Sequence, residues 1–176
     1  MNNWYVVTGG PSTGKTTLLA ELEKLGHKTI PEAARVVIDE ALAKGISVEE
    51  LRADEKRFQE DVARVKETVE AERDPNTLTF FDRGMQDTTA YMRHYGFTIE
   101  PWVKALTDKS RYQKVYLLEP LPTYETDYAR TEDKDFSQHL HKLLHDAYTE
   151  CGMEPIIVPA VSVEDRVKFV LDRVKT

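Results

Sequence analysis

The segment GGPSTGKT, at residues 9–16, limits the possible folds of this chain more than any other. It fits the pattern G-x-x-x-x-G-K-[ST], in which glycines let the backbone curl so that successive N–H groups point at phosphate oxygens. The apolar run 4–8 before it predicts a buried strand, and leucines at helical spacing after it predict a helix over 15–25. This order predicts a loop that binds a nucleoside triphosphate, rather than a turn that binds nothing.

The predicted phosphate-binding residues are the members of this loop and the start of the helix, namely Gly9, Gly10, Pro11, Ser12, Thr13, Gly14, Lys15, Thr16 and Thr17. We expect Lys15 to reach the β- and γ-phosphates and the hydroxyl of Thr16 to bind Mg²⁺. The partial positive charge of the helix N-terminus favours the same anion. The motif indicates a nucleoside triphosphate without indicating which reaction follows.

Short apolar segments alternate with helical patterns along the rest of the chain. Further strands are expected at 27–30, 78–81, 115–118 and 156–158, and helices at 32–44, 47–73, 85–95, 100–111, around 140–148, and 163–174. The charged stretch 47–73 could form one helix or a broken pair. This alternation predicts an α/β fold with a parallel sheet covered on both faces. With 176 residues and no break in composition, we expect a single domain over 1–176.

Composition and charge argue against several partners and locations. The formal net charge of −7 speaks against broad contact with nucleic acid or an anionic membrane. The single cysteine, Cys151, cannot form an internal disulfide, and the first residues lack the pattern of a signal peptide. No apolar run approaches the roughly 20 residues that a membrane helix needs. We therefore expect a cytoplasmic protein.

The third expected strand runs directly into Asp82-Arg83-Gly84. Ligands of open parallel sheets bind at the carboxyl ends of the strands, so Asp82 should lie near the glycine-rich loop if the first and third strands are neighbours. We predict that Asp82 holds Mg²⁺ or touches an acceptor, and that Arg83 binds a phosphate or stabilises a carboxylate. The simpler alternative is an aspartate that caps the next helix, followed by a surface arginine.

The second expected strand ends at the sequence PEAAR, residues 31–35. Glu32 could accept a proton from a substrate hydroxyl, and Arg35, about one turn further on, would face roughly the same way. The spacing leaves open a second interpretation, a first-turn glutamate that favours the helix dipole with an arginine in solvent.

A charged segment with several prolines, EPLPTYETDYARTEDKD, follows the fourth expected strand at 119–135. Long irregular segments in compact domains are often lids or binding loops. Arg130 is its only arginine. We predict that Arg130 moves onto the β- and γ-phosphates and stabilises the charge of the transition state, in preference to pairing with a neighbouring acid in an exposed loop.

Five segments together carry a family resemblance, namely VVTGGPSTGKTTL, PEAAR, FFDRGMQDTTAY, VYLLEPLPTYETDYARTED and LH–LLHDAY. They resemble the AAA-labelled ATP/GTP-binding domains related to the ribosylnicotinamide kinase domain of the bifunctional NadR protein, and a similar domain occurs in the TRPL translocation defect protein. The resemblance covers nearly the whole chain, with its elements in the same order. It implies a three-layer, kinase-like P-loop NTPase fold with a five-stranded parallel sheet and a short lid over about 119–137.

The resemblance also implies ligands and roles. It implies ATP or GTP with Mg²⁺, and it places the nucleotide base against the loop at 159–161. Carried over by motif, Gly14, Lys15, Thr16 and Thr17 bind phosphate and metal, and Arg130 is the lid arginine. Glu32 and Asp82 are the candidates for the base and for the carboxylate on the metal side.

Two functions remain open at this point. The first is a small-molecule kinase that transfers a γ-phosphoryl group to a hydroxyl of a nucleoside-like metabolite. Lys15, Mg²⁺ and Arg130 would stabilise charge, and the acceptor would lie against Glu32, Arg35, Asp82 and Arg83. The second is a nucleotide-dependent switch or slow NTPase that acts on a protein partner through the charged region 47–73. A remodelling motor is disfavoured, because one small domain leaves no room for the usual second helical domain.

Overall fold

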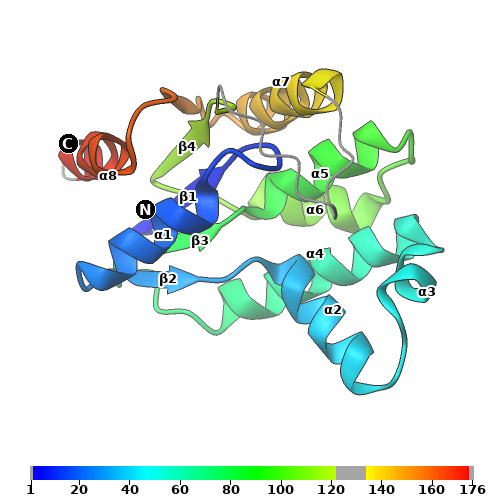
Figure 1. Ribbon diagram of the computed structural model, residues 1–176. Helices are drawn as coiled ribbons and strands as arrows, with labels where there is room; N and C mark the ends of the chain where they lie inside the picture. Colours follow the sequence, from blue (N-terminus) through cyan, green and yellow to red (C-terminus); the bar gives the residue numbers. More distant parts are fainter. Residues whose placement is uncertain (1, 122–133, 175–176) are drawn as a thin grey trace.

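The computed structural model describes residues 2–121 and 134–174 (Figure 1). Its centre is a five-stranded sheet with the order β2-β3-β1-β4-β5, and all the neighbouring strands pair in parallel. The strands are β1 (Trp4–Thr8), β2 (Lys28–Ile30), β3 (Thr79–Asp82), β4 (Lys114–Leu118) and β5 (Ile156–Val158). The five-stranded parallel sheet predicted for this chain is confirmed.

The helices follow the predicted alternation with the strands. They are α1 (Lys15–Lys24), α2 (Ala33–Ala43), α3 (Val48–Arg52), α4 (Glu55–Ala71), α5 (Met85–His94), α6 (Pro101–Lys109), α7 (Lys134–Glu150) and α8 (Val163–Val174). The stretch 47–73 is a broken pair. Ser47 and Glu50 form a capping box that starts α3, and the Asp54 side chain accepts from the Arg57 N–H to start α4.

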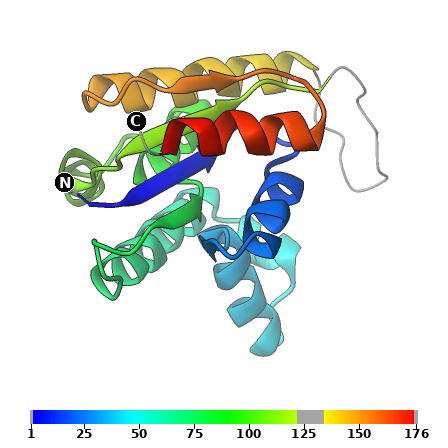
Figure 2. The ribbon, with the colours of Figure 1, turned by 90° about the vertical axis from the view of Figure 1, so that its left-hand side faces the viewer.

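Helices cover both faces of the sheet, with α1 and α8 on one face and α4, α5 and α7 on the other (Figures 1 and 2). Successive residues of β1 point to opposite faces of the sheet. Tyr5 and Val7 pack with α1 and α8, whereas Trp4 and Val6 pack towards α4 and α7. Burial on both faces explains why β1, β3 and β4 have largely apolar sequences.

The strand register brings three loop segments to one edge of the sheet. Val7 of β1 lies beside Asp82 of β3, and Ile30 of β2 lies beside Phe81. The first and third strands are therefore neighbours, as the position predicted for Asp82 required. The glycine-rich loop, Glu32 and the Asp82-Arg83-Gly84 turn all follow the carboxyl ends of these strands.

Two sequence predictions lie partly or wholly beyond this description. Arg130, together with most of the predicted lid, falls outside the residues that the structure describes.

Across the described ranges, no helix has both the length and the apolar character needed to span a membrane.

Candidate functional site

The loop between β1 and α1 has the backbone of a phosphate-binding turn. Gly9, Ser12 and Gly14 have φ values of 151°, 57° and 83°, in the region that favours glycine. A Cβ atom on Gly9 would lie 2.9 Å from Thr13 Oγ1, so a larger residue would clash there. The Leu18 N–H donates to the Gly14 carbonyl over 3.0 Å. The N–H groups before it have no carbonyl within the helix and can bind an anion.

Lys15 lies inside this loop and is almost completely buried. Its Nζ atom donates to the carbonyl oxygens of Gly9 and Gly10, over 3.0 and 2.7 Å. Burial and the nearby charge of Arg83 lower the pKa of Lys15 to about 7, although nearby carboxylates act in the opposite direction. A bound phosphate would add negative charge and raise this pKa again.

Asp82 ends β3 with a carboxylate oxygen, Oδ1, that is buried and has no hydrogen-bond partner among the described residues. Burial is the main reason that the pKa of Asp82 rises to about 6. Asp82 shares a pocket of about 190 Å³ with the exposed Thr16 and with Glu32 and Arg35.

These residues fit a Mg²⁺ ion that accompanies a nucleotide. A carboxylate and a hydroxyl are both oxygen ligands, and Mg²⁺ in such sites is held by few protein ligands, with waters and phosphates completing its shell. In the described part of the chain no group of three or more His, Cys, Asp or Glu side chains could hold a metal alone. Asp82 and Thr16 could hold such an ion together with phosphate oxygens and water.

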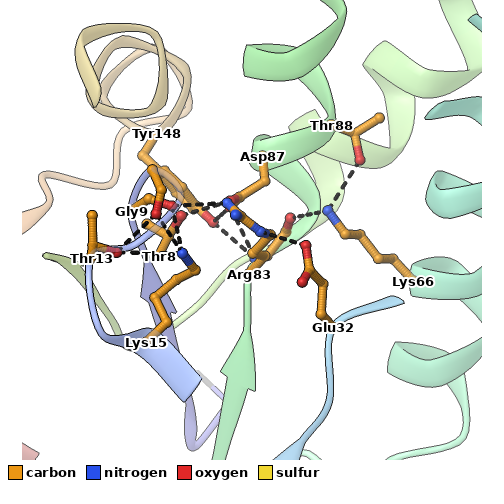
Figure 3. Close-up of polar contacts among 12 residues, drawn as sticks. Thr8, Gly9, Thr13, Lys15, Glu32, Lys66, Arg83, Asp87, Thr88 and Tyr148 are labelled. Atoms are coloured by element: carbon orange, nitrogen blue, oxygen red, sulfur yellow. Dashed lines mark hydrogen bonds and ion pairs between the residues drawn. The ribbon is translucent and has the colours of Figure 1, made fainter. Parts of the chain in front are cut away.

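Arg83 connects the loop to the ends of two other segments (Figure 3). Its Nε donates to Glu32 over 2.8 Å, and its Nη1 donates to the Gly9 carbonyl over 3.0 Å and to Asp87 over 3.1 Å. The side chain is only 7% exposed. The Arg83 backbone has φ 66°, a strained conformation for a residue other than glycine. Arg83 is thus a buried connector rather than the surface arginine of the simpler alternative.

Asp87, on the first turn of α5, holds Arg83 from the other side (Figure 3). Its buried carboxylate accepts from Thr8 Oγ1 over 2.6 Å, from the Gly84 N–H over 3.1 Å and from the Tyr148 hydroxyl over 2.5 Å. Burial acts to raise the pKa of Asp87, but nearby cations and these hydrogen bonds outweigh it and lower the pKa. Sequence reasoning missed Asp87 and Tyr148 as parts of the site.

Glu32 stands at the N-terminus of α2 but makes no capping hydrogen bond there. Its carboxylate pairs with Arg83 instead. Burial acts to raise the pKa of Glu32, but the charges of Arg83 and Lys15 and the hydrogen bond from Arg83 together lower it. Arg35 is exposed, and it lines the same pocket as Glu32 and Asp82.

A second pocket, of about 120 Å³, lies on the other side of Glu32. Its walls come from α2, α3, α4 and α5 and include Glu32, Phe58, Gln59, Lys66, Arg83 and Tyr91. Lys66 is buried, and its Nζ donates to the Gly84 carbonyl over 2.7 Å and to Thr88 Oγ1 over 3.2 Å. Glu32 therefore lines both pockets, of which the first also includes Thr16 and Leu19 of α1 and the second includes Arg83.

A five-stranded parallel sheet with this loop between β1 and α1 is a P-loop NTPase fold. The sequence model of one family, AAA_28, described as an AAA domain, matches residues 4–166, and the chain belongs to that family. A comparison with curated protein sequences finds no match.

Solved structures with the same fold include nucleoside and nucleotide kinases. Deoxyadenosine kinase from M. mycoides with bound dCTP is 15% identical, with a TM-score of 0.66 over 98% of each chain. Thymidylate kinase from Ehrlichia chaffeensis is 14% identical, with a TM-score of 0.68 over 98% of each chain. NadR protein in complex with NR is 21% identical, with a TM-score of 0.72 over 96% of this chain and 49% of that one. At these identities the likeness shows a shared fold.

Proposed function

We propose that the protein is a Mg²⁺-dependent small-molecule kinase that transfers the γ-phosphoryl group of ATP or GTP to a hydroxyl of a nucleoside-like metabolite. This proposal depends on Glu32, which lines two pockets. One pocket contains Thr16 and Asp82 beside the P-loop, and the other could hold a second small molecule. Transfer between two bound molecules needs this arrangement, because catalysis of phosphoryl transfer is mostly positioning and charge stabilisation.

On the donor side, the loop N–H groups and Lys15 bind the β- and γ-phosphates. Thr16 and Asp82 hold Mg²⁺, which when bound neutralises charge on the phosphates. Lys15 must leave its carbonyl contacts with Gly9 and Gly10 to reach a phosphate oxygen. The bound anion replaces these hydrogen bonds to neutral carbonyl oxygens with stronger ones to charged phosphate oxygens.

On the acceptor side, the substrate hydroxyl oxygen bonds to the γ-phosphorus while the bond between that phosphorus and the β–γ bridging oxygen breaks. The hydroxyl proton passes to a carboxylate. Glu32 is a candidate because it is ionised near neutral pH, lines both pockets and has its orientation fixed by Arg83. Asp82 is the second candidate for the base. The lid role of Arg130 stays a prediction.

The similar solved structures support a nucleoside-like acceptor. They are described as a deoxyadenosine kinase, a thymidylate kinase and NadR protein in complex with NR. Phe58 and Tyr91 in the second pocket offer apolar ring surface beside the polar groups of Glu32 and Gln59, which suits a ring-bearing metabolite with hydroxyls. The likeness to the TRPL translocation defect protein and the cytoplasmic location also stay predictions.

One observation favours the alternative, a regulatory switch or slow NTPase. A groove of about 580 Å³ runs beside α2, α3 and α4, and Val37, Ile46, Leu51 and Val65 form part of its lining. Ile46 and the nearby Val48 are 40% and 42% exposed. This surface includes part of the charged region 47–73 and could receive a protein partner.

Turnover assays separate the two functions. Purified protein is given Mg²⁺ with ATP or GTP, with and without a panel of nucleosides and ribosides, and both nucleoside diphosphate and phosphorylated product are measured. A kinase releases diphosphate only with an acceptor. Slow hydrolysis that no acceptor changes would favour the switch instead.

A matched pair of lysine variants on α1 controls for the assignment of the P-loop. Lys15→Ala should abolish turnover, because Lys15 lies within the loop. Lys24→Ala should have little effect, because Lys24 lies at the other end of α1 and pairs with Glu21 at the surface. Full activity of the Lys15 variant would exclude the loop as the phosphate site.

A further inference from the structure

Arg166, on the first turns of α8, is a buried arginine in direct contact with the P-loop. Its side chain donates three hydrogen bonds, all to backbone carbonyls. Nη1 donates to Thr13 over 2.5 Å, Nε to Pro159 over 2.9 Å and Nη2 to Glu119 over 3.2 Å. The three acceptors follow β1, β5 and β4 respectively, so one side chain joins three loops at the carboxyl edge of the sheet.

The guanidinium is nearly without solvent, since Arg166 is only 2% exposed. It forms no ion pair with any of the described residues, although the charge of Glu119 acts on it from a distance. Arg83 differs in this respect, because two carboxylates pair with it. Removing a cation from water costs free energy, and carbonyl dipoles compensate only part of that cost.

The location of this unpaired charge indicates what could compensate it. A Cβ atom on Gly14 would lie 3.2 Å from Arg166 Nη1, and Gly14 is the last loop residue before Lys15. The guanidinium is therefore directly behind the turn that presents N–H groups to an anion. A polyphosphate in the loop would place negative charge close to Arg166 through low-dielectric protein, where charges interact more strongly than in water.

We propose that Arg166 is a positioning residue of the nucleotide site, which fixes the three loops and whose positive charge strengthens the binding of polyphosphate. The proposal rests on the donor half of the proposed function, the binding of a nucleotide by the P-loop. It requires neither a kinase reaction nor any particular acceptor. Its specific consequence is that the loss of the charge weakens ligands in proportion to their phosphate content.

The test compares Arg166→Gln, which removes the charge but keeps an N–H donor, with Arg166→Lys, which keeps the charge. Affinities are measured by calorimetry or competition, at constant Mg²⁺, for ATP, inorganic tripolyphosphate and adenosine. Arg166→Gln should lower the affinities for ATP and tripolyphosphate by a similar factor, about tenfold or more, and change the affinity for adenosine by less than about twofold. Arg166→Lys should recover most of the affinity for both polyphosphates.

Arg173→Gln is the matched control, because Arg173 lies on the same helix and its guanidinium contacts Phe169 rather than the P-loop. It should leave all three affinities unchanged. The affinity of the natural protein for tripolyphosphate should also fall more steeply with salt than that of Arg166→Gln. Urea unfolding shows whether each variant is folded under the conditions of measurement.

Several outcomes would overturn the inference. An equal loss of affinity for adenosine and for ATP would mean that Arg166 only holds the three loops in place. An Arg166→Lys variant as weak as Arg166→Gln would mean that the charge has no role. If Arg166→Gln does not fold, an Arg166→Lys affinity for ATP more than about tenfold below the natural one contradicts the charge role. Failure of the natural protein to bind ATP would instead contradict the proposed function.

Discussion

The Nε atom of Arg83 donates to Glu32 across 2.8 Å and joins the end of β3 to the start of α2. The same guanidinium contacts the Gly9 carbonyl of the P-loop. One buried cation thus fixes the predicted base and the phosphate loop relative to each other. The backbone strain at Arg83, with φ 66°, is consistent with a position fixed by these contacts rather than by local preference.

Arg83→Met should be strongly destabilising, because it removes the cation that forms ion pairs with the carboxylates of Glu32 and Asp87. Removal of one member of a buried ion pair typically costs about 3–5 kcal/mol. The free energy of unfolding from urea denaturation measures this. Arg93→Met is the control, since Arg93 pairs with Glu150 at the surface and such pairs contribute only about 0–1 kcal/mol. Equal losses in the two variants would contradict the structural role of Arg83.

Gly84→Ala should disrupt the packing beneath the Asp82-Arg83-Gly84 turn. A Cβ atom there would lie 2.6 Å from the Tyr148 hydroxyl and 2.7 Å from a ring carbon of Tyr112. Both tyrosines are buried and hydrogen-bonded, so neither can move cheaply, and we expect a loss of at least about 3 kcal/mol in unfolding free energy.

Gly26→Ala separates steric overlap from backbone strain in that experiment. Gly26 has φ 89°, and a Cβ atom there meets nothing within 4 Å. Only backbone strain opposes this substitution, and it should lower the free energy of unfolding by about 1–2 kcal/mol. If Gly26→Ala is the more damaging variant by thermal or urea unfolding, the close packing at Gly84 is wrong.

Tyr148→Phe tests the hydrogen-bonded network around Asp87. The Tyr148 hydroxyl donates to Asp87 and accepts from the Gly84 N–H over 3.0 Å, so its removal leaves buried groups with fewer partners. We expect a loss of about 1–3 kcal/mol in urea unfolding and lower turnover, because Asp87 holds Arg83. Tyr116→Phe, which removes a single 3.2 Å hydrogen bond to the Val170 carbonyl, should cost less and leave turnover unchanged.

The alternation of apolar runs and helices was sufficient to predict the sheet and most helix positions. Burial on both faces gives β1, β3 and β4 largely apolar sequences that are easily recognised, whereas the short β2 is not buried. The position of Asp82 was predictable for a related reason, because a residue at the end of a strand that neighbours β1 must lie beside the P-loop.

The network that supports the site was not predictable in the same way. Tyr148 lies 61 residues from Asp87 along the chain, and no local pattern joins them. Arg166 and Thr13 are 153 residues apart, and only the packing of α8 behind the loop brings them into contact. Such pairs depend on tertiary packing, which sequence periodicity does not encode.

Lys66 shows a signal that could have been recognised. In α4 the apolar residues Phe58, Val62, Val65 and Val69 predict one packed face and leave the charged positions to solvent, yet Gln59, Ala63 and Lys66 are also buried. These residues are spaced by four and three positions, so they form a second stripe facing α5. The signal in the sequence is the helical spacing that places the small Ala63 on the same face as Gln59 and Lys66.

Asp82 should make nucleotide binding dependent on pH. Because its pKa in the folded protein is raised to about 6, the side chain is mostly ionised at pH 7.5 and mostly protonated at pH 5. A protonated carboxyl does not ligate Mg²⁺, so the affinity of the natural protein for Mg²⁺–ADP should fall relative to that of Asp82→Asn as the pH drops through 6, whereas the protonation of Lys15, with a pKa of about 7, affects both proteins. In Asp82→Asn the affinity should be lower at pH 7.5 and depend less on pH.

Calorimetric titrations from pH 5 to 8 measure both proteins, with Glu23→Gln in the same pocket as the control. Parallel pH profiles for the natural protein and Asp82→Asn would exclude Asp82 as the metal-side carboxylate.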